Sequence, residues 1–114
     1  MASYILVLYN DRKQKIEVGK LGFFEFEPGY YYYVGSAEKI SRVRRHFGRK
    51  RKKWHIDYIS EVFDVLGAIL LNFEECELAK KVKLTPIKGF GCSDCDCYSH
   101  LFYSRNFTIE YLLT

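Results

Sequence analysis

The sequence predicts a single α+β domain in which a small antiparallel sheet is covered by helices. Short β-prone segments come first, helical patterns follow them, and one apolar run between two helices returns to the sheet. The chain of 114 residues is long enough for one domain with a modest core, which we assign to residues 1–114. An aromatic content of 18% indicates that large rings fill this core.

The first part of the chain predicts an antiparallel meander of strands. An apolar and aromatic run after Met1 is typical of a central strand, and it ends at the turn signal Asn10-Asp11. Gly19 and Gly22 mark bends or bulges, and Pro28-Gly29 marks a further turn. The expected strands are residues 3–9, 15–18, 23–26 and 30–34.

Helical patterns and one returning strand fill the second part of the chain. The helix expected over residues 38–47 follows Ser36, a good N-cap, and ends at Gly48. Its apolar stripe, which includes Phe47, is expected to face the core. The other expected elements are helices over 54–61, 74–83 and 106–113, a buried strand over 65–71, a loop over 85–99 and a strand over 100–103.

The junction between the aromatic strand and the first helix gathers groups that suit a phosphodiester. Tyr33 lies near the end of the strand, and Gly35 offers unusual backbone angles and a close approach to a ligand. In the helix, Arg42, Arg45 and His46 are spaced i, i+3 and i+4, so they share one face. Hydroxyl, backbone and guanidinium groups are therefore expected in one small space.

This junction resembles the second half of the signature of the GIY-YIG nucleases. The matching residues are Tyr33-Val34-Gly35-Ser36-Ala37, Arg42 and Arg45-His46-Phe47, and the resemblance extends over residues 3–80. The chain also resembles a small archaeal-type branch of that superfamily with Trp54-His55-Ile56-Asp57-Tyr58 and a late Asp-Cys-x-Cys-x-Ser-His segment. The resemblance implies an α+β fold, hydrolysis of phosphodiester bonds in DNA and a Mg²⁺ or Mn²⁺ ion.

The resemblance also implies roles for the tyrosines and the arginines. Tyr4 keeps the tyrosine of the family's first motif without its glycine, and with Tyr33 it would help to deprotonate an attacking water. A phenol has a pKa of about 10, so this role needs a nearby cation. Arg42, or Arg45 because the spacing is one residue shorter than in the family, would stabilise charge on the phosphate. Alternatively, both tyrosines belong to the edge of the core and Arg42 to the surface.

Glu75 is the expected metal ligand, with Glu77 as runner-up. The family places two apolar residues three and four positions after its glutamate, and Leu78-Ala79 follow Glu75 at that spacing. One carboxylate is enough for Mg²⁺, which keeps much of its hydration shell. As an alternative, acidic residues stabilise a helix N-terminus through its dipole. His46 and His55 are expected to assist proton transfer or to contact DNA, or else to be structural.

Basic residues crowd at the end of the first expected helix and in the loop that follows it. Eight of the chain's 18 lysines and arginines lie at positions 42–53, where no acid occurs, and the net charge is +4. This pattern predicts a phosphate-binding strip, and a solvated loop is the alternative. The expected nucleic-acid contacts are Arg49, Lys50, Arg51, Lys52, Lys53 and His55.

A late cysteine cluster has the ligand types and spacing that zinc uses. Its members are Cys92, Cys95, Cys97 and His100, whereas Cys76 is isolated in the sequence. The alternative is that this segment is a loop that folds over the expected active site and brings polar side chains near the substrate.

The leading hypothesis is a divalent-metal-dependent endonuclease that acts on DNA, with RNA as an alternative substrate. The chain has no apolar run of about 18 residues and no signal peptide, so we expect a cytoplasmic protein without a membrane partner. A homodimer or a partner repair enzyme would allow such a small domain to cut both strands. The rival hypotheses are a non-catalytic nucleic-acid-binding module on the same scaffold and a zinc-stabilised interaction protein.

Overall fold

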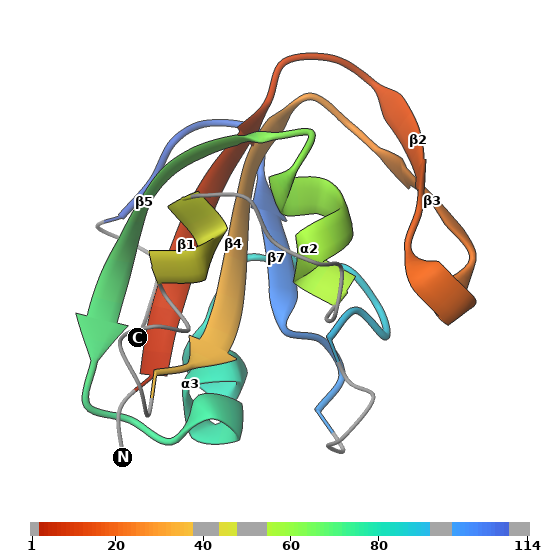
Figure 1. The fold of residues 1–114 in the computed structure, drawn as a ribbon. Helices are drawn as coiled ribbons and strands as arrows, with labels where there is room; N and C mark the ends of the chain where they lie inside the picture. The colour runs from red at the N-terminus through yellow and green to blue at the C-terminus, as the bar shows by residue number, and fades with distance from the viewer. Residues whose placement is uncertain (1–2, 38–43, 48–54, 92–96, 110–114) are drawn as a thin grey trace.

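The computed structural model describes residues 3–37, 44–47, 55–91 and 97–109. Within these ranges the predicted α+β fold class is confirmed, because an antiparallel sheet is packed against helices (Figure 1). Several residues of the predicted motifs lie outside the described residues, namely Arg42, Arg49, Lys50, Arg51, Lys52, Lys53, Trp54, Cys92 and Cys95.

Two long strands form the centre of a five-stranded sheet, β1 (Ser3–Asn10) and β4 (Gly29–Ser36). β5 (Asp64–Leu71) pairs with the outer side of β1, and β7 (Leu101–Ser104) pairs with the outer side of β4. The short strand β6 (Thr85–Pro86) completes the order β5-β1-β4-β7-β6, in which every pairing is antiparallel. Successive aliphatic and tyrosine side chains of β1 and β4 point to opposite faces of the sheet and are mostly buried, so both faces of these strands are apolar.

The predicted meander is wrong, because β2 (Gln14–Glu17) and β3 (Phe23–Phe26) form a separate two-stranded hairpin. The chain leaves the sheet after β1 and returns as β4, which pairs directly with β1 (Figure 1). The 3-10 turn η1 (Gly19–Leu21) lies between the hairpin strands. Gly19 and Gly22 have φ angles of 50° and 89°, which confirms the predicted bends. Ile16, Phe24 and Phe26 of the hairpin pack against the core, whereas Phe23 is exposed, and the hairpin does not extend the sheet.

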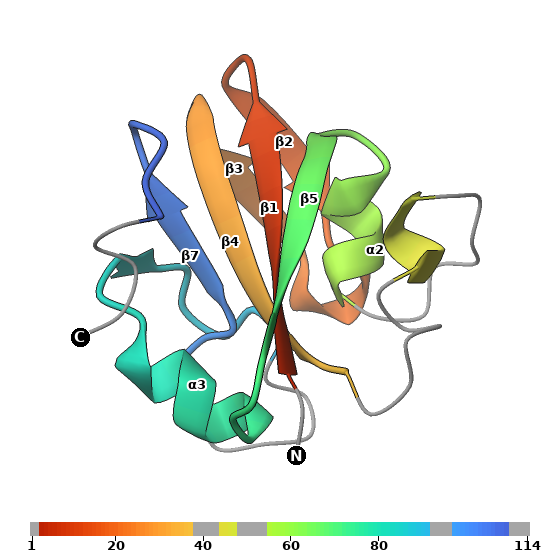
Figure 2. The same cartoon turned by 90° about the vertical axis from the view of Figure 1, so that its left-hand side faces the viewer.

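The helices α2 (His55–Ser60) and α3 (Glu75–Lys81) cover opposite faces of the sheet (Figures 1 and 2). On the α2 face the core consists of Tyr4, Leu6, Leu8, Val18, Phe26, Tyr31, Tyr33, Ile56, Ile59, Phe63, Phe90 and Leu101. On the α3 face it consists of Ile5, Val7, Tyr32, Val34, Leu78, Ala79, Val82 and Phe102. Among the described helices, none has the length and apolarity that crossing a bilayer requires.

β5 is a strand as predicted, but it is not buried. It stands at one edge of the sheet, and its residues Leu66 and Leu70 are 51% and 55% exposed. The described helices pack mainly against β1, β2 and β4, so the continuous apolar run of β5 does not lie between two covering layers.

The predicted C-terminal helix does not begin at Asn106, because the described residues through Ile109 are not helical. The hydroxyl of Tyr32 donates a hydrogen bond to the carbonyl of Thr108 at 2.8 Å and accepts one from its N–H at 2.9 Å. The carbonyl and the N–H of Thr108 are therefore hydrogen-bonded to a side chain of the sheet and not to the backbone of a helical turn.

Candidate functional site

Two tyrosines and a histidine meet at the end of the central strands, on the α2 face of the sheet. Tyr4 stands opposite Gly35 in the β1–β4 pairing, and its ring centroid lies 6.2 Å from that of Tyr33. The Oη of Tyr4 is 2.8 Å from Nε2 of His46, and the two rings are 5.6 Å apart at their centroids. We call Tyr4, Tyr33 and His46 the tyrosine–histidine group.

Gly35 is required in this group for space and not for its backbone angles. Its φ is not among the positive values found at other glycines. A Cβ at this position would lie 2.4 Å from Cζ of Tyr4 and 2.5 Å from its Oη, which no ordinary contact allows. The missing side chain therefore lets the Tyr4 ring lie against β4, where its hydroxyl reaches His46.

The tyrosine–histidine group is well buried, since Tyr4 and His46 are each 4% exposed and Tyr33 is 8% exposed. A phenol and an imidazole joined by a hydrogen bond can exchange a proton, with either group as donor according to the tautomer. The arrangement can therefore hold and move a proton between Tyr4 and His46.

His46 comes from the 3-10 turn η2 (Arg45–Phe47), and its place corrects the predicted orientation of this segment. The predicted apolar stripe put Phe47 in the core and His46 beside it, but Phe47 is 56% exposed and His46 is buried. A 3-10 turn advances 120° per residue instead of about 100°, which rotates the last side chains relative to an α-helix. Arg44 is exposed, and the side chain of Arg45 lies outside the described part of the structure.

His55 lies at the start of α2, on the same face as the tyrosine–histidine group. Its Nδ1 accepts a hydrogen bond of 2.8 Å from the backbone N–H of Gly91, so the neutral ring carries its proton on Nε2. Its ring packs against Phe90 at 5.7 Å between centroids, and Phe90 in turn packs against Tyr33 at 6.3 Å. Phe90 thus packs against both His55 and Tyr33.

Glu75 begins α3, and its carboxylate faces a histidine that immediately precedes β7. Oε2 of Glu75 lies 3.1 Å from Nδ1 of His100. Glu77, the runner-up metal ligand, is exposed. Glu74 is the N-cap of α3, because its carboxylate accepts hydrogen bonds from the N–H groups of Cys76 and Glu77. The alternative interpretation, in which an acidic residue stabilises the helix N-terminus, therefore applies to Glu74.

A second cluster of potential ligands unites Cys76, Cys97 and His100. Their ligand atoms all lie within 4.8 Å of one another, which makes a possible metal-binding cluster. The sequence predicts Cys97 and His100 as ligands, but its indication that Cys76 is isolated is wrong. Nothing in the local spacing pointed to Cys76, since it is 24 residues from His100 and only the packing of α3 against the sheet brings them together.

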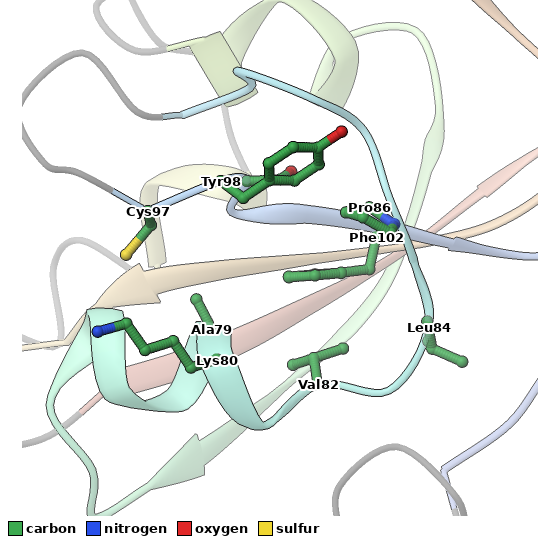
Figure 3. Close-up of a pocket in the computed structure, with 9 residues that line it drawn as sticks. Ala79, Lys80, Val82, Leu84, Pro86, Cys97, Tyr98 and Phe102 are labelled. Carbon is green, nitrogen blue, oxygen red and sulfur yellow. The ribbon is translucent and has the colours of Figure 1, made fainter.

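An apolar cavity of about 230 Å³ lies beside this cluster, between α3 and β7 (Figure 3). Cys97 stands at the end of the cavity nearest the start of α3, and Phe102 forms part of its wall. The full lining is Ala79, Lys80, Val82, Leu84, Pro86, Cys97, Tyr98, Ser99 and Phe102.

Fold and site together define a small α+β domain. Two tyrosines of its central antiparallel strands form a buried group with His46 on one face of the sheet, and a thiol–imidazole cluster lies at the start of α3. The chain belongs to the family described as "Domain of unknown function DUF123", which matches residues 3–113. Comparison with curated proteins and with solved structures gave no match in either case.

Proposed function

We propose that this protein is a divalent-metal-dependent endonuclease that hydrolyses phosphodiester bonds in DNA, on a scaffold of the GIY-YIG type. The observation that supports this proposal best is the hydrogen bond between Tyr4 and His46 beside Tyr33, at a glycine that the Tyr4 ring requires. These residues match the motif positions on which the resemblance to GIY-YIG nucleases rests. Cytoplasmic location and a homodimer or partner repair enzyme remain part of the proposal.

In the proposed reaction the tyrosine–histidine group accepts the proton of an attacking water. The water gives a proton to Oη of Tyr4 while the hydroxyl proton of Tyr4 passes to Nε2 of His46, a distance of 2.8 Å. The water oxygen forms a bond to phosphorus, and the bond from phosphorus to the departing sugar oxygen breaks. The departing oxygen then takes up a proton from solvent. Tyr33, which is slightly more exposed than Tyr4, is the second candidate for the first proton transfer.

Mg²⁺ or Mn²⁺ is the metal that this chemistry would use, with Glu75 or Glu77 as the protein ligand. The ion would supply positive charge to the phosphate oxygens. Glu75 is partly exposed, and a carboxylate that serves His100 with one oxygen has a second oxygen for a hydrated ion. Arg42, or Arg45 as the alternative, would add a fork of donors for the phosphate. Zinc is a separate proposal, since it calls for softer donors than these carboxylates.

The test compares cleavage of plasmid DNA by the parent, Tyr4→Phe and Tyr9→Phe in Mg²⁺ or Mn²⁺. Tyr4→Phe removes only the hydroxyl that bonds His46, so we expect the rate to fall about 10²–10⁴-fold. Tyr9 lies on the same strand with its ring against Tyr30, and its variant should cleave like the parent. If Tyr4→Phe cleaves as fast as the parent, the Tyr4–His46 pair is structural and the proposed proton path is wrong.

A non-catalytic nucleic-acid-binding module is the second candidate function, favoured by the deep burial of Tyr4 and His46. Gel-shift binding in EDTA separates the two candidates. A parent protein that binds DNA in EDTA but leaves plasmid intact in Mg²⁺ and Mn²⁺ would establish the binding module and reject the nuclease.

A further inference from the structure

The contacts of His100 fix which of its ring nitrogens carries the proton and which carries the lone pair. Nδ1 faces two acceptors, the backbone carbonyl of Val34 at 3.0 Å and Oε2 of Glu75 at 3.1 Å. Two acceptors at one nitrogen require the proton to be there. The neutral imidazole therefore carries its lone pair on Nε2, which lies 4.0 Å from Sγ of Cys76.

The surrounding backbone holds His100 in place before any ligand binds. Its N–H donates to the carbonyl of Phe90 at 2.9 Å, and its carbonyl accepts from the N–H of Val34 at 2.8 Å. Gly91 has a φ of 77° and packs so closely that a Cβ there would lie 2.9 Å from Cβ of His100. The His100 side chain is 1% exposed, so the ring has little room to turn away.

The two cysteines bring two thiol donors close to this lone pair, which gives three potential ligands. Cys76 and Cys97 are both thiols, and Sγ of Cys97 lies 3.9 Å from the backbone carbonyl of Cys76. With the usual Zn–S and Zn–N bond lengths, tetrahedral ligands stand about 3.5–3.8 Å apart. The observed 4.0 Å between Cys76 and His100, and the limit of 4.8 Å for all three ligand atoms, require only a small contraction.

We propose that Cys76, Cys97 and His100 bind a zinc ion and that Glu75 is a positioning residue, which orients His100 through Nδ1. Two thiolates balance the charge of a divalent ion, and thiolate with imidazole is a donor set that zinc favours. A carboxylate on the far nitrogen of a metal-bound histidine is a recurrent feature of zinc sites. The ion ties the start of α3 to the residues that precede β7, and it stabilises the fold independently of the proposed nuclease chemistry.

The first test measures the metal in the parent chain purified under reducing conditions. Elemental analysis should find close to one zinc per chain, and a chelator should lower the thermal midpoint until zinc is restored. Cobalt in place of zinc should give the absorption of thiolate-to-metal charge transfer. Cys76→Ser and Cys97→Ser should each lose zinc, and the charge-transfer band should weaken. A parent that takes up neither metal would overturn the proposal, as would cysteine variants that keep full zinc content.

The second test keeps every proposed ligand and changes only the positioning carboxylate. Glu75→Gln should weaken zinc affinity about 10–100-fold, measured by competition with a chromogenic chelator, while one zinc still binds at saturation. Glu77→Gln is the matched control on the same helix and should bind zinc like the parent. Because both side chains are at least partly exposed, this pair carries the test even if a cysteine variant fails to fold. Equal affinities in both variants would reject the role of Glu75.

Discussion

At the scale of single residues, Gly35 shows how a missing side chain shapes the candidate site. The Tyr4 ring occupies the space that a Cβ at Gly35 would need, and the same ring position brings Oη to His46. A glycine in a strand interior normally weakens the strand. Here that weakening is offset by a buried aromatic contact and a hydrogen bond that no larger residue at position 35 would permit.

We therefore predict that Gly35→Ala lowers the free energy of unfolding by about 1–3 kcal/mol, the usual cost of overpacking a core. Gly67→Ala is the matched control, because Gly67 also lies in an antiparallel strand and a Cβ there would meet nothing within 4 Å. Its effect should stay within about 0.5 kcal/mol. Urea unfolding of the two variants measures both values, and equal decreases would mean that the Tyr4 ring moves aside without cost.

Tyr31 couples the stability of the core to alkaline pH. Burial is the main reason why the pKa of its phenol is raised well above the ordinary value, and Tyr103 and Glu27 nearby add to the effect. Burial likewise raises the pKa of Tyr32. Above about pH 10 the unfolded chain loses these phenol protons while the folded chain keeps them. The folded state then binds more protons, so the free energy of unfolding falls as the pH rises.

The predicted result is a steep decrease in stability above about pH 10, at up to about 1.4 kcal/mol per pH unit for each such tyrosine. Tyr31→Phe should flatten this slope, although it also removes the hydrogen bond to the carbonyl of Glu27 and lowers stability at neutral pH. Urea midpoints recorded at a series of alkaline pH values provide the measurement, and an unchanged slope in Tyr31→Phe would contradict the assignment.

The sequence was sufficient to place Tyr31 and Tyr33 on one face, because strand alternation is a local rule. It was not sufficient to pair Tyr4 with His46, which is 42 residues away along the chain. The side chain of His46 points into the core because Arg45–Phe47 form a 3-10 turn. Residue spacing alone predicted an α-helix over these residues.

At the scale of elements, the start of α3 depends on Glu74. The carboxylate of Glu74 accepts hydrogen bonds of 2.9 Å from the N–H of Cys76 and 3.4 Å from that of Glu77. Glu74→Ala should therefore cost about 0.5–2 kcal/mol, the range for removal of an N-cap, while Glu74→Asp should retain most of the stability. Chemical unfolding of the three proteins tests this. If the alanine variant is as stable as the parent, the cap contributes nothing.

Elements with strong local patterns were predictable, and their partners were not. β3 has the limits that the sequence predicts, and the helix predicted over residues 74–83 contains the observed α3. The pairing of β1 with β4 passes over a whole hairpin, so an expectation of neighbouring strands gave the wrong meander. Cys76 was overlooked for the same reason, since tertiary packing and not spacing sets its neighbours.

At the scale of the whole molecule, the cluster of basic residues predicts how the proposed binding to DNA depends on salt concentration. The triple variant Arg51→Ala, Lys52→Ala and Lys53→Ala should bind DNA more weakly, whatever the DNA sequence. The slope of log K against log salt should become shallower by about 0.9 for each phosphate that the variant no longer neutralises. A triple alanine variant at Lys13, Lys15 and Lys20 changes the net charge equally and should leave the slope near the parent's. Equal slopes in both triple variants would mean that the basic residues at 51–53 are only a solvated surface.

The order of the strands has a consequence for how the chain is made. β1 is translated before both strands that flank it in the sheet, and the pairing of Tyr4 with Leu70 must wait until β5 has been translated. Each of these pairings closes a long loop. The chain loses the entropy of loop closure before the contacts between the paired strands can stabilise the sheet. Topologies of this kind fold slowly. The apolar strand β1 is therefore translated before both of its sheet partners and stays unpaired until they follow, and during that interval it is a part of the nascent chain that a chaperone would protect.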